Sequence, residues 1–320
     1  MQLEQIQALA DRIRVNIGQV VVGKEEVVEK MLIALIASGH ILLEDVPGTG
    51  KTLLAKAMAK SLNCDFKRIQ FTPDLLPTDL SGIHFFNQKS SEFEFRPGPL
   101  FTNLLLADEI NRATPRTQSS LLECMEERQV SIDGETFRLA RPFLVIATQN
   151  PLEQQGTFPL PEAQLDRFLF KVKMGYPSTE EGLAILKRFK EDNPLERIVG
   201  VATAEDIAAA QEHYSAVAVH DDVLAYLLQL VERTRSHGEV AIGVSPRGSQ
   251  ALLKAAQVAA LLQGRDFVTP DDVKRMAKPV LAHRILVKGT LRTRSETAEA
   301  IIDAIIRDVP VPSEPMARSR

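Results

Sequence analysis

Two short stretches carry residue types that could bind and cleave a chain of phosphates. The first runs from Leu42 to Thr52 (LLEDVPGTGKT), and the second runs from Leu104 to Glu109 (LLLADE). Glycines in the first stretch let backbone N–H groups approach phosphate oxygens, and a helix that begins near Lys51 adds the positive end of its dipole. The two stretches together predict binding and hydrolysis of ATP with Mg²⁺ as a second cofactor.

Each polar residue of these stretches has an expected role. Lys51 would reach the β- and γ-phosphates, and the Thr52 hydroxyl would bind Mg²⁺. Asp108 would hold the water shell of the metal, and Glu109 would orient the attacking water. The usual loop has a glycine where this chain has Asp45, so the first stretch departs from the pattern at one acidic residue. We assign nucleotide binding to Pro47, Gly48, Thr49, Gly50, Lys51, Thr52 and Leu53.

The composition is that of an ordinary globular protein. The chain has 320 residues, of which 44% are hydrophobic and 25% are charged, and its formal net charge is −4. This length is enough for two domains with separate cores. The mild acidity disfavours sequence-independent binding to DNA, which needs clustered Lys and Arg, so no nucleic-acid partner is expected.

The sequence also restricts where the protein works. Met1–Arg14 carries charges throughout, unlike a signal peptide, and the apolar stretch Met31–Leu43 is too short to span a bilayer. We therefore expect a cytoplasmic protein without membrane insertion. Cys64 and Cys124 stand far apart without the spacing of metal ligands, and we expect buried, reduced thiols.

Elements that would position these residues follow from the apolar pattern. Apolar stretches alternate with short helical patterns as far as about Tyr176, which predicts a parallel sheet between helices. From Ser178 onward, capping boxes and cap-proline pairs introduce one helical pattern after another. We expect an αβα domain over 1–177, an all-α domain over 178–308 and a disordered tail over 309–320. Strands are expected at Ile41–Glu44, Phe66–Phe71, Asn103–Asp108, Phe143–Thr148 and Phe168–Val172.

Two hairpins interrupt the alternation of strands and helices. Residues 79–96 alternate Phe and Ile with polar residues around a turn at Asn87–Ser91, and residues 129–139 contain the turn pair Asp133-Gly134. These hairpins either cover sheet edges or contact a partner.

Seven stretches of the chain match one known family: VVGKEEVVEKMLIAL, LLEDVPGTGKT, RIQFTPDLLPTDLSG, FEFRPGPLF, LLLADEINRATPRTQSSLLECMEERQVSIDGE, VIATQNPLEQQGTFPLPEAQLDRFLF and VSPRGSQALLKAAQ. With these stretches the chain as a whole resembles the MoxR family of AAA+ ATPases. This resemblance implies an α/β fold with an AAA+ P-loop αβα core, a helix-2 insert and a pre-sensor-1 hairpin, followed by a smaller helical lid. It further implies assembly into a homo-oligomeric ring, usually a hexamer.

The resemblance assigns further catalytic residues. Asn150 matches sensor 1, Arg247 matches sensor 2 on the lid, and Arg167 matches the arginine finger that reaches a neighbouring subunit's nucleotide. Arg112 and Arg116 are rivals for the finger. Whether Arg247 acts on its own subunit's nucleotide or on a neighbour's is left open.

Other residues gain expected contacts in the same way. Val22 and Gly23 would lie against adenine. The two hairpins fall at the insert positions, so Phe85, Phe86 and Phe93 are candidates for contact with a partner, with local packing as the alternative.

The expected function is ATP hydrolysis coupled to chaperone-like remodelling or maturation of a protein client, including insertion of a metal cofactor. The resemblance suggests a partner that carries a von Willebrand factor A domain. Three alternatives remain open: a chelatase-type ATPase subunit, a nucleic-acid motor and a nucleotide-dependent scaffold with slow hydrolysis.

Overall fold

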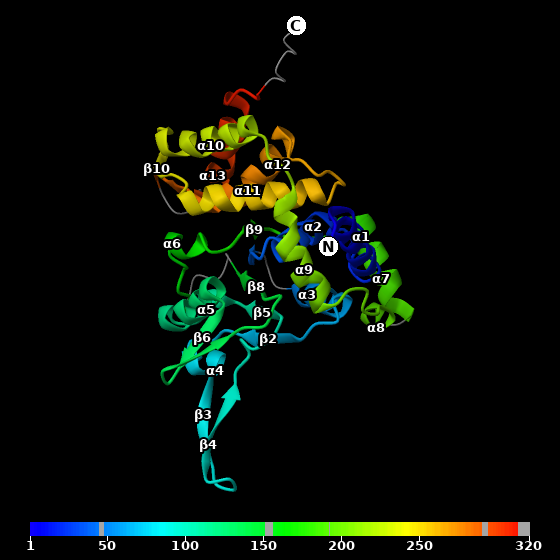
Figure 1. Cartoon of the computed structure of the whole chain (residues 1–320), viewed down its shortest axis with the longest axis vertical. Coiled ribbons are helices and arrows are strands. Elements are labelled where there is room, and N and C mark those ends of the chain that lie inside the picture. Colours follow the sequence, from blue (N-terminus) through cyan, green and yellow to red (C-terminus); the bar gives the residue numbers. More distant parts are fainter. Residues whose placement is uncertain (45–47, 151–155, 192, 290–293, 313–320) are drawn as a thin grey trace. The chain divides into compact units, whose positions relative to one another are not determined.

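The computed structural model describes residues 1–44, 48–150, 156–191, 193–289 and 294–312. Contacts group the chain into two compact units (Figure 1). One is the core unit, Ala8–Glu212, and the other is the lid unit, which combines Met1–Gln7 with His213–Arg320.

A five-stranded parallel sheet is the centre of the core unit, with the strand order β2-β5-β8-β1-β9. Its three inner strands are almost entirely apolar and buried, as expected for parallel strands covered on both faces. The predicted strands are confirmed, with boundaries that differ by up to two residues. The strands of this sheet are β1 (Ile41–Glu44), β2 (Phe66–Gln70), β5 (Leu104–Asp108), β8 (Leu144–Gln149) and β9 (Phe170–Val172).

Helices cover both faces of this sheet, which confirms the predicted αβα core. On one face, Leu121 and Met125 of α5 pack with Leu105 of β5 and Val145 of β8. Residues on the opposite face, such as Leu106, are equally buried. The helices of the core unit are α1 (Leu3–Gly18, whose first residues group with the lid unit), α2 (Glu25–Ile36), α3 (Lys51–Ser61), α4 (Pro77–Ser81), η1 (Ile110–Arg112), α5 (Pro115–Glu127), α6 (Glu162–Leu165), α7 (Thr179–Glu191), α8 (Pro194–Arg197) and α9 (Ala204–His213).

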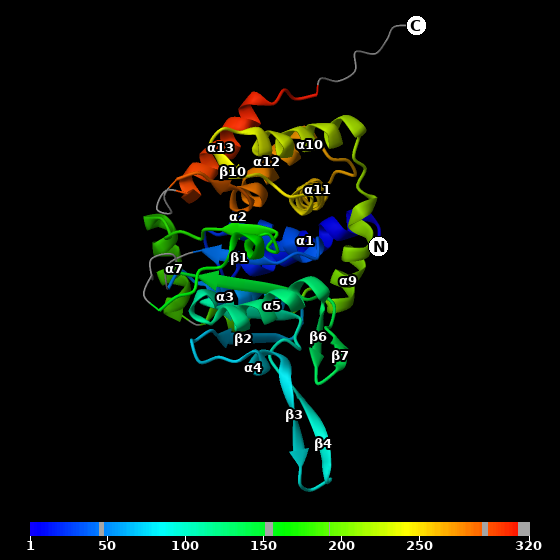
Figure 2. The ribbon, with the colours of Figure 1, turned by 90° about the vertical axis from the view of Figure 1, so that its left-hand side faces the viewer.

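Two hairpins branch from the core unit. β3 (Gly82–Asn87) pairs with β4 (Glu92–Pro97), and β6 (Gln129–Ile132) pairs with β7 (Glu135–Arg138). Figures 1 and 2 show β3 and β4 extending beyond α4, away from the sheet. The first hairpin begins later than predicted, because Asp79 belongs to α4, where its carboxylate accepts the Leu76 N–H at 2.9 Å.

Side chains join the two hairpins at two places. Phe95 of β4 stacks on Phe137 of β7 with ring centres 4.6 Å apart. His84 of β3 lies 2.9 Å from a carboxylate oxygen of Asp133, in the turn between β6 and β7. The two hairpins therefore form one connected extension.

By its contacts, the segment 178–212 belongs with the core unit. The sequence pattern predicts instead that the helical domain begins at 178. Arg188 of α7 donates to the Gly18 carbonyl at 2.7 Å, and the Val201 N–H donates to the Ser61 carbonyl at 2.8 Å. A helical pattern reveals a helix but not the element on which it packs. The division by contacts therefore falls between Glu212 and His213.

The lid unit is helical, as predicted, and it also contains the short antiparallel pair β10 (Val240–Ile242) and β11 (Leu286–Val287), which was not predicted. Most of the predicted tail lies outside the described residues, but its first residue, Val309, is buried and its N–H donates to Ile305. The helices are η2 (Tyr214–Ala216), α10 (Asp221–Ser236), α11 (Pro246–Leu261), α12 (Pro270–Leu281), η3 (Ala282–Arg284) and α13 (Arg294–Asp308).

No helix within the described part of the chain combines the length and the apolar character needed to cross a membrane.

Candidate functional site

The predicted phosphate loop connects β1 to α3. Gly48 and Gly50 have φ angles of 86° and 90°, a region that glycine adopts without strain. Among the described residues, no atom beyond the glycine itself and its two chain neighbours lies within 4 Å of the place where a Cβ would stand on either one, so a ligand can approach the backbone closely. Lys51 begins α3, and Thr52 and Leu53 follow in its first turn, where N–H groups have no partner within the helix. Thr49 lies between the glycines, whereas Pro47 and Asp45 lie outside the described residues.

Three neighbouring strands deliver the predicted residues to one edge of the sheet. In the β1–β8 register Glu44 is opposite Gln149, and in the β5–β8 register Ala107 is opposite Ala147. Because parallel strands end at a common edge, the phosphate loop, Asp108-Glu109 and Asn150 all leave the sheet on the same side. Ligands of open α/β sheets bind at this edge.

Thr148 links the two acidic residues. Its hydroxyl donates to Oδ1 of Asp108 at 2.6 Å and accepts the Glu109 N–H at 2.9 Å. The Glu109 backbone has φ 57°, in the left-handed region that costs a non-glycine residue about 1–2 kcal/mol. The buried Thr148 hydroxyl therefore orients the Asp108 carboxylate and also stabilises the backbone conformation of Glu109.

Polar side chains surround the Glu109 carboxylate. Gln70, at the end of β2, donates to its Oε2 at 2.7 Å, and Nε of Arg112 lies 2.9 Å from the same oxygen. Arg68, two residues earlier on β2, donates to Oδ2 of Asp108 through Nη2 at 2.7 Å. Both acidic residues are thus bonded to β2, the edge strand of the sheet.

The turn after β5 is tied to the segment that follows Asn150. The Phe158 N–H donates to the Asn111 carbonyl at 2.6 Å, and Gln118 of α5 donates to the carbonyls of Phe158 and Ile110. Asn111 also places its Nδ2 3.5 Å from the Asn150 carbonyl. Segments after neighbouring strands are therefore held against each other.

The arginines predicted to contact the nucleotide lie on different elements of the fold. Arg167 follows α6, and its Nε lies 3.0 Å from Oε2 of Glu126. Arg112, a rival for the finger, contacts Glu109 of its own subunit. Arg116 is exposed on α5, and Arg247 is exposed in the first turn of α11, in the lid unit.

Val22 and Gly23 lie between α1 and α2. Gly23 has a φ angle of 68°, in the left-handed region that favours glycine, and its Cα faces the Glu181 carboxylate. Glu181 itself accepts the Ser178 N–H at 2.7 Å, which confirms the predicted capping box of α7.

His40 is a structural residue. It is buried, its Nδ1 accepts the Val145 N–H at 3.0 Å, and Nε2 therefore donates to the Met125 carbonyl, also at 3.0 Å. Burial, aided by the nearby positive charge of Arg128, lowers the His40 pKa to about 3. The ring is neutral near neutral pH.

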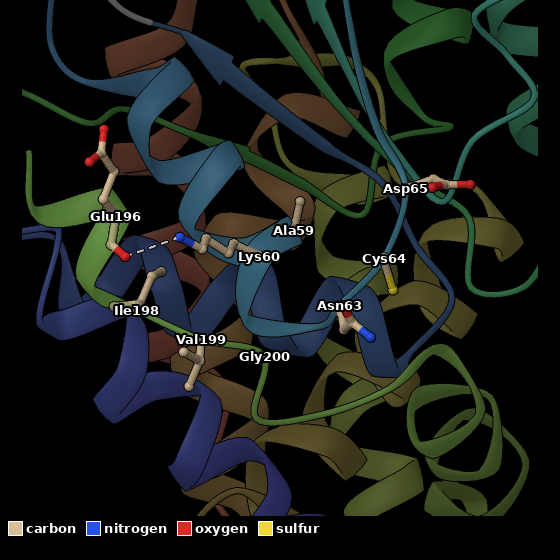
Figure 3. A pocket seen from close by; sticks show the side chains of 9 residues that line it. All are labelled: Ala59, Lys60, Asn63, Cys64, Asp65, Glu196, Ile198, Val199 and Gly200. Atoms are coloured by element: carbon tan, nitrogen blue, oxygen red, sulfur yellow. Dashed lines mark hydrogen bonds between the residues drawn. The ribbon is translucent and has the colours of Figure 1, made fainter.

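A hollow of about 530 Å³ lies at the carboxyl end of α3, opposite the end that begins at Lys51 (Figure 3). Lys60 crosses from α3 to the Glu196 carbonyl at 3.4 Å. Cys64, which lines this hollow, is half-buried rather than buried as predicted, and burial raises its pKa to about 11. Cys124 is buried, and both thiols are free. A protonated thiol at this end of α3 adds nothing to phosphate chemistry.

Arg68, Gln70 and Thr148, which contact the two acidic residues, are not among the predicted site residues. One signal was available, because the period of two along β2 places Arg68 and Gln70 on one face. Which acidic residues they contact depends on the strand order, and the sequence pattern does not contain that order.

Comparisons with known proteins agree with this fold. The model of the ATPase family associated with various cellular activities (AAA) matches residues 40–170, and the AAA lid domain model matches residues 232–305. A crystal structure from Cytophaga hutchinsonii, named provisionally as an ATPase, superimposes with a TM-score of 0.90 at 38% identity and covers 97% of each chain.

Curated relatives cover nearly the whole chain. Uncharacterized protein YeaC of Bacillus subtilis is 52% identical over 93% of both chains. Chaperone MoxR1 of Mycobacterium tuberculosis is 42% identical over 93% of this chain and 81% of its own length. Protein MoxR of Paracoccus denitrificans is 34% identical over 92% of this chain and 94% of its own. With the AAA core, the helical lid and these full-length similarities, the chain belongs to the MoxR family of AAA ATPases.

Proposed function

We propose that this ATPase uses the cycle of ATP binding and hydrolysis to remodel a protein client in a chaperone-like way. The observation that carries the proposal is the β3–β4 hairpin, which extends from the same core unit that holds the phosphate loop. Toward its far end it exposes Phe85 (39%) and, more fully, Phe86 and Phe93. Similarity to a relative named as a chaperone supports the same conclusion.

Within one subunit, Lys51 binds the β- and γ-phosphates, and the backbone of Gly48–Gly50 surrounds them. Glu109 orients the attacking water, while Asn150, at the end of the neighbouring strand, contacts the γ-phosphate or that water. Val22 and Gly23 lie against adenine.

The donor set suits Mg²⁺. Within the described residues, no group of three or more His, Cys, Asp and Glu side chains could hold a metal ion. Mg²⁺ in nucleotide sites needs no such group, because one or two protein oxygens and the phosphates hold it while it keeps several waters. Thr52 and Asp108 provide oxygens of this kind. The bound metal would neutralise charge that develops on the phosphates during hydrolysis.

Each complete site forms between two subunits of a homo-oligomeric ring, for which we propose six members. Arg167 supplies positive charge to the nucleotide of the neighbouring subunit, and Arg247 grips phosphate oxygens from the lid. Guanidinium groups suit both roles because they bind phosphate through two parallel N–H groups.

The client-contact surface consists of the cross-strand pair Phe86 and Phe93. Their side chains are 51% and 73% exposed, and their ring centres lie 5.4 Å apart. The other half of the same hairpin face is covered, since Phe95 packs on Phe101 and Phe137. Local packing thus accounts for the base of the hairpin but not for its far end. Exposed aromatic rings of this kind mark protein interaction sites.

The family resemblance extends the proposal in two ways that the residues themselves do not determine. Maturation of the client includes insertion of a metal cofactor, and a protein with a von Willebrand factor A domain acts as a partner.

ATP-dependent recovery of a chemically unfolded test enzyme would test this function. The wild-type protein should raise the recovered activity with ATP, and the double variant Phe86→Ser/Phe93→Ser should lose this gain while keeping its basal ATPase rate. Phe267→Ser removes a similarly exposed ring (51%) in the lid unit and serves as the control. Equal recovery with the double variant would contradict the proposed surface. Stimulation of the ATPase by DNA or RNA would favour a nucleic-acid motor instead.

A further inference from the structure

Arg68 contacts the carboxylate to which we assign the metal. Its Nη2 and Nε lie 2.7 and 3.2 Å from Oδ2 of Asp108, so two nitrogens of one guanidinium approach a single oxygen. Nη2 also donates to Oε1 of Gln70 at 3.2 Å. The Arg68 guanidinium is thereby held over the end of β5.

The two oxygens of Asp108 have very different partners. Oδ1 accepts from Thr148, which is buried, lies within β8 and has no freedom to leave. Oδ2 accepts from Arg68, whose side chain is 47% exposed at the edge of the sheet. One oxygen therefore has a fixed partner, and the other has a partner that solvent can replace.

A guanidinium and a metal ion compete for the same oxygen. Both are cations, and placing them together on Oδ2 brings two positive charges within a few ångström of each other. Thr148 is buried and keeps its bond to Oδ1, whereas the partner of Oδ2 is exposed, so Oδ2 is the oxygen at which Mg²⁺ or one of its waters would meet Arg68. The Arg68 side chain must give up at least part of its contact when the metal binds.

We propose that Arg68 is a counter-ion that holds Asp108 in the metal-free site and competes with Mg²⁺ for it. This inference rests on the proposed role of Asp108 in metal binding. Arg68 keeps the carboxylate paired and pointed into the site, and the arrival of the metal with its nucleotide displaces the guanidinium from Oδ2. The affinity for Mg²⁺ is lower than Asp108 and Thr52 would give on their own.

Binding of the fluorescent nucleotide mant-ADP at increasing Mg²⁺ concentration measures this competition without hydrolysis. The variant Arg68→Gln should reach half of the Mg²⁺-dependent gain in affinity at about fivefold less Mg²⁺ than the wild type. This factor corresponds to roughly 1 kcal/mol, the upper range for a partly exposed ion pair. Arg68→Lys, which keeps the charge but not the two-nitrogen contact, should lie between the two.

Lys67→Gln is the matched control. Lys67 precedes Arg68 on β2, so its side chain points to the opposite face of the strand, where its Nζ lies 3.4 Å from the Gly98 carbonyl. The control removes one positive charge from the same strand without touching Asp108, and its Mg²⁺ dependence should equal that of the wild type.

Three results would overturn the inference: an unchanged Mg²⁺ requirement in Arg68→Gln, a higher requirement, or the same decrease in Arg68→Gln and Lys67→Gln. If Arg68→Gln does not fold, as judged by circular dichroism, Arg68→Lys decides by the same criteria. If the wild type binds mant-ADP without any dependence on Mg²⁺, the proposed metal role of Asp108 itself fails. A wild type that depends on Mg²⁺ while the Arg68 variants behave like it would overturn only the competition.

Discussion

Thr148 and Asp108 lie on neighbouring strands, and the hydroxyl of Thr148 lies 2.6 Å from Oδ1 of Asp108. The same hydroxyl accepts the N–H of Glu109 at 2.9 Å. One buried side chain thus positions two acidic residues for which we propose different tasks, metal binding and activation of water. The strand that carries Thr148 ends at Gln149, one residue before Asn150. The end of this strand therefore positions Asp108, Glu109 and Asn150.

Replacing Thr148 by Val should lower kcat/KM for ATP by about tenfold or more. The change keeps the shape of the side chain but removes the hydroxyl that positions both acidic residues, and a small misplacement of groups near the reacting atoms costs up to about a hundredfold in rate. Thr148→Ser keeps the hydroxyl and should stay within about twofold of the wild type. Steady-state ATPase kinetics of both variants provide the measurement. Equal losses in the two variants would mean that the hydroxyl is not responsible.

Replacing Glu109 by Gln should reduce hydrolysis about 10²- to 10⁴-fold, the usual contribution of a group that activates water. Binding of ATP should remain, because the phosphate loop is unchanged. Single-turnover hydrolysis and equilibrium binding of mant-ATP separate the two effects. Glu123→Gln, an exposed change on α5, provides the control. Unchanged turnover in Glu109→Gln would remove this residue from the mechanism.

Stability of the core unit should fall as the pH falls below about 6.5, in part because of His40. The folded state holds its pKa near 3, whereas an unfolded histidine has a pKa of about 6.5, so protons bind the unfolded chain first. The contribution of His40 is complete above pH 6.5 and decreases by about 1.4 kcal/mol per pH unit below it, or roughly 2 kcal/mol between pH 7 and pH 5.

The free energy of unfolding by urea, measured for the wild type and for His40→Gln at pH 7, 6 and 5, would test this contribution. The variant should be less stable at pH 7 but should lose less stability on acidification, whereas His213→Gln, an exposed change, should follow the wild type. If the free energy of unfolding of the wild type and of His40→Gln changed with pH in the same way, protonation of His40 in the unfolded chain would not be the cause.

Local patterns were sufficient to predict the parts of the fold that depend on local chemistry. Ile41–Glu44 is a strand with the predicted bounds because a buried parallel strand is a short, continuous apolar run. Asp133 and Gly134 both have positive φ angles, as the predicted hairpin turn requires. Asp108 and Glu109 were likewise recognisable, because they stand at the end of such an apolar run.

Features that depend on long-range packing were not predictable. β10 and β11 have three and two residues, too few for a period to be recognised. The bonds of Arg68 and Gln70 to the acidic residues require β2 to lie beside β5, which follows from the strand order rather than from either segment. The contact of Arg167 with Glu126 likewise joins the turn after α6 to α5, which are distant in sequence.

We propose that each ATPase site is completed by a neighbouring subunit. The most direct test of this proposal is specific ATPase activity as a function of protein concentration, with particle mass measured in parallel, for the wild type, Arg167→Ala and Glu126→Gln. We predict that the wild-type activity rises as rings form. Arg167→Ala should assemble but remain slower by at least about a hundredfold, since an arginine finger contributes roughly 10³–10⁵ to the rate. Glu126→Gln, which removes only the partner of Arg167 within the subunit, should stay close to the wild type. Wild-type turnover in Arg167→Ala, equal losses in the two variants, or an activity that does not change with concentration while rings form would contradict the shared site.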